Sequence, residues 1–124
     1  MITGIGIDIV QIRRMQRWLE MPGILERYFH HRELAEAMTR GNKAVFSLAA
    51  RFAAKEAFGK ALGTGFEGIA LKDIMVINNP GGQPAMHLFE TALAAFSKNG
   101  ANRIHVSLTH ERDNAAAMVV LEEI

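Results

Sequence analysis

Two carboxylates stand in stretches of sequence that otherwise indicate burial. Asp8 interrupts an alternating strand pattern and shares a face with Gly4 and Gly6, while isoleucines occupy the opposite face. Glu56 lies within RFAAKEAFGKALGTG (51–65), where helical periodicity places it inside the apolar stripe. A carboxylate buried alone costs several kcal/mol or becomes protonated, so it usually has a cation, a metal or hydrogen-bond donors nearby.

One carboxylate on a strand and one on a helix are a typical protein contribution to a Mg²⁺ site, whose remaining ligands are waters and phosphate oxygens. The pattern alone does not bring the two residues together, and simpler roles stay open. Glu56 is also compatible with an ion pair to Lys60, four residues later on a solvated helix edge. Asp8 is also compatible with capping the turn that follows its strand.

A phosphate-binding interpretation of the end of the same stretch rests on Lys60 and on Gly63, Thr64 and Gly65. Together they offer a cation, a hydroxyl and unhindered backbone N–H groups. Gly63 is equally well explained as the residue that ends the helix, and the helix dipole disfavours an anion at that end. The stretch is not a Walker A loop, because alanine follows Gly59-Lys60.

Two further polar sets have both a functional and an ordinary interpretation. His105, Ser107 and Thr109 share one face of a predicted strand, which suits either a ligand or the wet face of a sheet. A basic helix carries three arginines and a fourth follows it, which suits either an acidic partner or simple solvation. These arginines are Arg13, Arg14, Arg17 and Arg27.

The elements that must position these residues are those of a small α+β domain. The periodicity predicts one long central helix over residues 43–62, with Asn42 as its N-cap and Gly63 at its end. An antiparallel sheet is expected to pack on this helix. The other predicted helices span 11–20, 24–29, 31–39 and 88–98, and the predicted strands span 2–10, 69–77, 84–88, 103–109 and 114–122. We find no repeat or linker, so residues 1–124 are predicted to form a single domain.

Composition narrows the classes of protein that fit. The chain has 124 residues and no cysteine, which excludes disulfides and thiolate metal sites and favours the cytoplasm. Its 14 basic and 13 acidic residues leave a net charge of +1, which argues against binding nucleic acid by bulk charge. No apolar run approaches the ~20 residues of a membrane span, and the first residues lack the basic leader of a signal peptide. We therefore expect no nucleic-acid and no membrane partner.

Three motifs resemble those of the holo-[acyl-carrier-protein] synthases, the small single-domain phosphopantetheinyl transferases. GIGIDIV (4–10) resembles the N-terminal motif, RFAAKEAFGKALGTG (51–65) the second motif, and HVSLTHERDNAAAMVVLEE (105–123) the C-terminal hairpin. The second motif is the most specific of the three. The chain departs from the family at Asn114, where tyrosine is usual, and at Ile7, where threonine is frequent.

The resemblance implies transfer of 4′-phosphopantetheine from coenzyme A to a serine of apo-acyl carrier protein, with release of adenosine 3′,5′-bisphosphate, in fatty acid biosynthesis. It implies Mg²⁺ held by Asp8 and Glu56, charge stabilisation by Lys60, and removal of the serine proton by Glu56 directly or through a water. The catalytic residues expected are thus Asp8, Glu56 and Lys60. The coenzyme-binding residues expected are Arg51, Lys55, Lys60, Gly63, Thr64, Gly65, His105, Ser107 and Thr109.

The resemblance also implies a homotrimer with active sites at the subunit interfaces. Because acyl carrier proteins are acidic, it assigns their docking to the basic helix, through Arg13, Arg14 and Arg17, with Arg27 added. Two other functions stay open on the residues alone. One is a non-catalytic nucleotide-binding module, and the other is a magnesium-dependent pyrophosphate hydrolase that needs no carrier.

Overall fold

A computed structural model describes all 124 residues. The predicted helices and strands are all present, with ends that shift by a few residues. In chain order the elements are β1 (Ile2–Gln11), α1 (Ile12–Leu19), α2 (Ile24–Tyr28), α3 (His31–Met38), the 3₁₀ turn η1 (Gly41–Lys43), α4 (Ala44–Leu62), the 3₁₀ turn η2 (Leu71–Asp73), β2 (Ile74–Asn78), β3 (Pro84–Leu88), α5 (Glu90–Asn99), β4 (Arg103–His110) and β5 (Asn114–Glu122).

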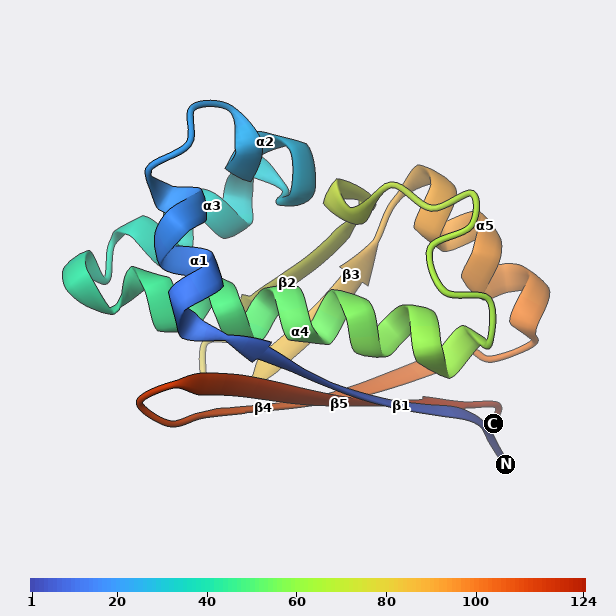
Figure 1. Cartoon of the computed structure of the whole chain (residues 1–124). Coiled ribbons are helices and arrows are strands. Elements are labelled where there is room, and N and C mark those ends of the chain that lie inside the picture. The colour runs from blue at the N-terminus through green and yellow to red at the C-terminus, as the bar shows by residue number, and fades with distance from the viewer.

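Helix α4 forms the centre of the molecule (Figure 1). Alanine and other strong helix formers dominate it, and it is buried on nearly all sides rather than along one stripe. Gly63 ends it with a left-handed φ of 81°, as predicted. The predicted N-cap was wrong: Asn42 lies within η1, and the helix begins after Lys43 without a side-chain cap.

The prediction of one antiparallel sheet on the long helix is confirmed in outline, but the strands form two sheets. Strands β1, β5 and β4 make a three-stranded antiparallel sheet in that order, and α4 lies across its inner face (Figure 1). Strands β2 and β3 pair separately as an antiparallel hairpin. Strand β2 starts later than predicted because Leu71–Asp73 form the turn η2.

Two glycines let β1 run against the backbone of α4. A Cβ on Gly4 would lie 2.1 Å from the carbonyl oxygen of Ala61, and a Cβ on Gly6 would lie 1.9 Å from that of Ala57. Any side chain at either position would therefore push the strand away from the helix. Asp8 follows on the same face of the strand, so this packing carries its carboxylate to the surface of α4.

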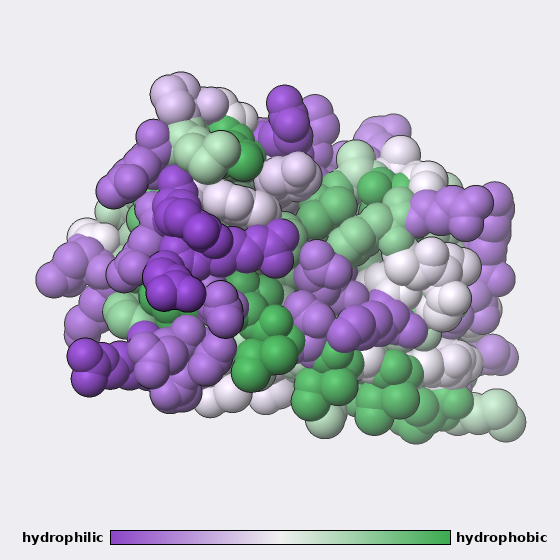
Figure 2. Space-filling model, viewed as in Figure 1, coloured by the Kyte–Doolittle hydropathy of each residue, from purple (hydrophilic) through white to green (hydrophobic).

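The outer face of the three-stranded sheet is apolar and exposed. Ile5, Ile7 and Ile9 are 63%, 61% and 66% exposed, and Met118 lies opposite Ile7 on β5. Figure 2 shows a hydrophobic band along this lower edge of the molecule. Such a band is larger than scattered surface residues produce. None of the helices combines the length and apolarity that crossing a membrane requires.

Candidate active site

Glu56 is the one residue between Leu48 and Gly59 that is not buried. Its carboxylate is half-buried and forms no hydrogen bond or ion pair within the chain. Burial raises the pKa of Glu56, and the nearby Asp8 carboxylate raises that pKa further, whereas Arg14 and Lys60 act in the opposite direction. The two predicted carboxylates are thus brought together, one from β1 and one from α4.

Lys60 completes this group from the next turn of α4. Its ammonium donates to Asp8 Oδ1 at 2.8 Å and to the carbonyl oxygen of Ile7 at 3.1 Å. This contact raises the pKa of Lys60, which keeps it a cation. The alternative pairing of Lys60 with Glu56 is therefore not formed, and Asp8 binds this lysine rather than capping a turn.

The donor set of this group fits a divalent cation that a substrate helps to hold. The structure contains no group of three or more carboxylates, histidines or cysteines that would enclose a metal by itself. Asp8 and Glu56 supply two carboxylates, which is the usual protein share of a Mg²⁺ site completed by phosphate oxygens and waters. Two carboxylates held close together also need a cation between or beside them, because their charges repel.

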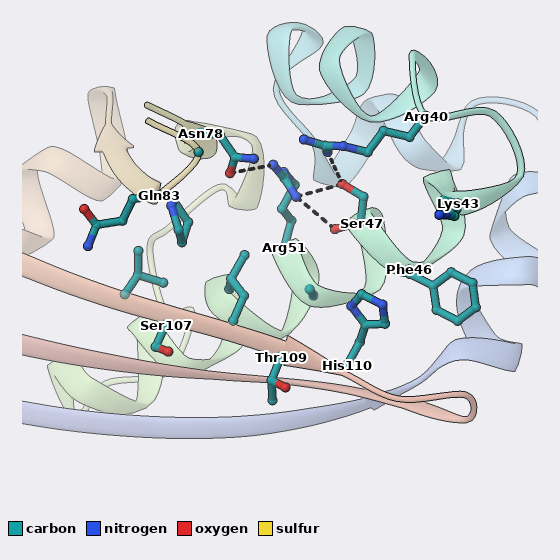
Figure 3. A pocket seen from close by; sticks show the side chains of 15 residues that line it. Arg40, Lys43, Phe46, Ser47, Arg51, Asn78, Gln83, Ser107, Thr109 and His110 are labelled. Atoms are coloured by element: carbon teal, nitrogen blue, oxygen red, sulfur yellow. Dashed lines mark hydrogen bonds between the residues drawn. The ribbon is translucent and has the colours of Figure 1, made fainter. Parts of the chain in front are cut away.

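A second candidate site lies on another side of α4 and is strongly basic. It is a cavity of about 620 Å³ between α4, β4 and the turn that joins β2 to β3 (Figure 3). Arg40, Lys43, Arg51 and His110 line it, and no carboxylate does. Of these four, the sequence had indicated only Arg51, because the others lie in loop or strand-end positions without a periodic signal.

Arg51 is fixed in the wall of this cavity and is almost fully buried. Its guanidinium donates to the carbonyl oxygen of Val76 at 2.9 Å and to Ser47 Oγ at 2.7 Å, and it lies 3.4 Å from Glu36. Arg40 donates to the same Ser47 oxygen at 2.6 Å, so two guanidiniums converge there (Figure 3). Burial and the charge of Arg40 lower the pKa of Arg51. Arg40 and Arg51 together give the cavity a positive charge, which suits a phosphate.

Lys55, predicted to bind the coenzyme, lies in the interior of the chain. Its side chain is fully buried and forms an ion pair with the equally buried Glu33 at 2.7 Å. The ammonium also donates to the carbonyl oxygens of Leu71 and Ile74. All three donors are used inside the protein, so none is left free for the predicted contact with the coenzyme, which stays a prediction. Lys55 instead ties α4 to α3 and to the start of β2.

The three polar residues of β4 share one face of the strand, as predicted, and it is the outer face of the sheet. Ser107 and Thr109 border the basic cavity, but in Figure 3 their side chains point away from Arg51. His105 lies outside that cavity, exposed on the outer face of the sheet, where its Nε2 is 2.9 Å from Glu122 Oε1. Within one chain, therefore, all three side chains lie on the outer face of the sheet.

The Gly63-Thr64-Gly65 turn is exposed at the far end of α4. Thr64 lines a further cavity of about 750 Å³, together with Lys98 and Asn99 of α5.

Arg51 and Glu56 project from different sides of α4. They are five residues apart, so their side chains leave the helix about 140° apart. The predicted coenzyme-binding residues thus surround α4 on several sides and do not form one cleft within a single chain.

The four predicted docking arginines are exposed on or near α1 and α2, and none of them forms an ion pair. Arg14 is distinguished by its neighbours. Its guanidinium carbon lies 5.0 Å from the ring centre of Trp18 and 5.1 Å from that of Phe52, and its charge acts on Glu56. Of the four exposed arginines, Arg14 is therefore the one whose charge acts on a carboxylate of the pair formed by Asp8 and Glu56.

The fold and these groups define a class: small α+β proteins that present paired carboxylates, a lysine and a separate basic cavity to a phosphorylated ligand. Comparison with known proteins makes the class specific. A family model described as the 4′-phosphopantetheinyl transferase superfamily matches residues 4–119. The holo-[acyl-carrier-protein] synthase of Treponema denticola is 53% identical over 122 residues, which cover 98% of this chain and 99% of the relative.

Solved structures agree with this match. The holo-(acyl-carrier-protein) synthase from Bacillus anthracis, solved in complex with CoA (3′,5′-ADP), has a TM-score of 0.83 and 34% identity, covering 100% of this chain and 99% of that chain. The Helicobacter pylori enzyme, in complex with coenzyme A, has a TM-score of 0.81 and 28% identity, covering 95% and 99%. This chain belongs to the 4′-phosphopantetheinyl transferase superfamily.

Proposed function

We propose that this chain transfers the 4′-phosphopantetheine group of coenzyme A to a serine hydroxyl of apo-acyl carrier protein and releases adenosine 3′,5′-bisphosphate. The family match and the relatives named holo-[acyl-carrier-protein] synthase support the reaction. The single structural observation that carries it is the meeting of Asp8, Glu56 and Lys60 at the crossing of β1 and α4. Residues 1–124 act as one transferase unit.

The side chains of this group supply an acid–base role and an electrostatic one. The serine oxygen attacks the phosphorus that carries the pantetheine, and the bond from that phosphorus to the bridging oxygen breaks. Glu56 takes the serine proton, directly or through a water. Lys60, protonated beside Asp8, stabilises the negative charge that develops on the leaving phosphate.

Asp8 and Glu56 are also the residues that we assign to Mg²⁺. When bound, the ion would neutralise charge on the pyrophosphate oxygens and orient them. The fit rests on the two adjacent carboxylates, which the chain leaves without a full set of partners of its own.

The coenzyme is proposed to use the basic cavity for its remaining phosphate, through Arg51, Arg40 and Lys43 beside Ser107 and Thr109. Because Arg51 and Glu56 face different sides of α4, one chain does not offer both to one molecule. Two neighbouring chains would offer both, with His105 and the turn 63–65 contributed at the boundary. The division of the site over the helix surface thus favours active sites between subunits.

A homotrimer is the assembly that we propose for this arrangement. The exposed isoleucines Ile5, Ile7 and Ile9 and the neighbouring Met118 form a face that a second copy would cover. The acidic carrier is proposed to dock on Arg13, Arg14, Arg17 and Arg27, whose charges are unpaired within the chain. The cytoplasm, expected from the absence of cysteine, stays a prediction, as does the place in fatty acid biosynthesis.

The experiment that tests the proposal measures adenosine 3′,5′-bisphosphate by chromatography after incubation with coenzyme A and Mg²⁺, with and without apo-acyl carrier protein. We expect release only when the carrier is present. Release without carrier would identify a pyrophosphate hydrolase, and no release under either condition would identify a binding module. Omission of Mg²⁺ in the presence of a chelator is the matched control and should stop the reaction.

A further inference from the structure

The arginines of the basic surface differ in how firmly the chain holds them. Arg13, Arg17 and Arg27 are exposed, with no ion pair and no aromatic ring beneath the guanidinium. Arg14 also has no ion pair, but its guanidinium lies over two rings, at 5.0 Å from Trp18 and 5.1 Å from Phe52. A guanidinium on an aromatic face is attracted by the ring and loses conformational freedom, while its N–H donors stay available.

The two rings are themselves fixed by a larger aromatic cluster. Trp18 stacks on Tyr28 with ring centres 5.1 Å apart and meets Phe52 edge-on at 5.0 Å. Phe52 is 3% exposed and also contacts Phe29. The cluster therefore joins α1, α2 and α4 through three aromatic contacts, each in a favourable geometry. Trp18 is the only tryptophan of the chain and is itself half-buried.

The place where Arg14 is held matters because of Glu56. Phe52 and Glu56 are one helical turn apart on α4, so the ring that supports Arg14 lies beside the carboxylate pair. Arg14 lies over that ring at 5.1 Å, so its guanidinium is held on the side of α4 from which Glu56 projects. An acidic residue that pairs with Arg14 would consequently be placed next to the group that receives the serine.

We propose that Trp18 is a positioning residue: with Phe52 it holds Arg14 in advance at the boundary between the carrier-docking surface and Glu56. This inference rests on the proposed transferase function and adds a determinant of carrier affinity to it. A free arginine would lose side-chain freedom when it paired with the carrier, whereas Arg14 is already ordered. Removal of the ring should therefore weaken carrier binding while the chemistry of the bound complex is unchanged.

The test compares Trp18→Leu, Trp18→Phe and Leu19→Ala, the last removing apolar bulk from the same helix away from the rings. Trp18→Leu should raise the KM for apo-carrier about fivefold, the factor that about 1 kcal/mol of cation–π attraction represents. The KM for coenzyme A and kcat at saturating carrier should stay at wild-type values. Trp18→Phe should recover most of the carrier affinity, and Leu19→Ala should match the wild type in all three constants.

Fluorescence keeps the inference testable if Trp18→Leu does not fold. In Arg14→Gln the emission of Trp18 should differ from that of the wild type, because the guanidinium no longer covers the ring. Identical emission would overturn the inference, as would an unchanged carrier KM in folded Trp18→Leu or an equal rise in the KM for coenzyme A. A wild-type protein that modifies no carrier would instead contradict the proposed function, so the two failures are distinguishable.

Discussion

At the scale of single residues, two lysines of one helix have opposite roles. Lys60 is exposed and its ammonium reaches Asp8, whereas Lys55, five residues earlier, is fully buried against Glu33. Burial lowers the pKa of Lys55, although Glu33 opposes this effect. Glu33 also accepts hydrogen bonds from the backbone N–H groups of His30 and Val76. The buried pair therefore fixes α3 and β2 against α4.

Replacement of Lys55 separates these roles. Lys55→Met should lower the free energy of unfolding by about 3–5 kcal/mol, because it leaves the Glu33 carboxylate buried without its cation. Urea denaturation measures this loss. Calorimetry at a temperature where the variant is folded should show coenzyme A affinity close to that of the wild type. Lys72→Met, at an exposed lysine without an ion pair, is the matched control and should change neither quantity.

A stable Lys55→Met protein that had lost coenzyme binding would contradict this assignment. That result would indicate that Lys55 binds the coenzyme, as the sequence predicted. The sequence did not indicate this burial, because a lysine inside a motif looks the same whether its partner is a ligand or a distant glutamate. Glu33 is 22 residues away in the chain, and no periodicity links the two positions.

At the scale of elements, the crossing of β1 over α4 sets the distance between the two carboxylates. The strand approaches the helix backbone so closely that only glycine fits at positions 4 and 6. Asp8 is carried by the strand and Glu56 by the helix, so the separation of their carboxylates depends on this packing. Gly4 and Gly6 thus help set the separation of the two carboxylates, although neither contacts a ligand.

A methyl group at Gly6 should disturb this distance. Gly6→Ala places a Cβ 1.9 Å from the carbonyl oxygen of Ala57, so the strand must move away from the helix. Overpacking of this kind costs about 1–3 kcal/mol, and the melting temperature should fall accordingly. The concentration of Mg²⁺ required for half-maximal activity should rise as the carboxylates separate. Gly81→Ala is the control, because nothing lies within 4 Å of its added Cβ, and it should leave both values unchanged.

A Gly6→Ala enzyme that is less stable but has the same Mg²⁺ requirement would disprove the link between packing and metal binding.

The helices and strands themselves were largely predictable from the sequence, because alternation identified β1 and periodicity identified α4. The pairing of Asp8 with Glu56, which the motifs suggest, could likewise be anticipated from the sequence. The basic cavity was not: Arg40, Lys43 and His110 come together only through the tertiary fold.

At the scale of the whole molecule, the apolar outer face of the sheet and the divided site point to the same assembly. In the proposed trimer a neighbouring copy covers the exposed isoleucines on β1, and each active site combines the basic cavity of one chain with the carboxylates of another. Helix periodicity indicated charged residues on more than one side of α4. It did not reveal that Arg51 lines a cavity while Glu56 lies outside it, which depends on where β2, β3 and β4 pack.

A charge placed in the apolar face should dissociate the assembly. Ile7→Glu should reduce the mass in solution from three chains to one, because the buried carboxylate would have no cation. Multi-angle light scattering measures that mass, and circular dichroism should show an intact fold. Transfer activity should fall with the loss of trimer. Leu93→Glu, at an exposed leucine of α5, should keep both mass and activity. A trimeric Ile7→Glu protein would rule out this face as the interface.

Asp8, Glu56 and Lys60 are proposed to form the centre of a phosphopantetheinyl transferase. The most direct measurement is the intact mass of apo-acyl carrier protein after incubation with coenzyme A, Mg²⁺ and this protein. With the wild type, the carrier should gain the mass of one 4′-phosphopantetheine group. With Glu56→Gln the rate of that gain should fall by about 100-fold or more, since the base and a metal ligand are lost together. A carrier of unchanged mass with the wild type, or an undiminished rate with Glu56→Gln, would contradict the account.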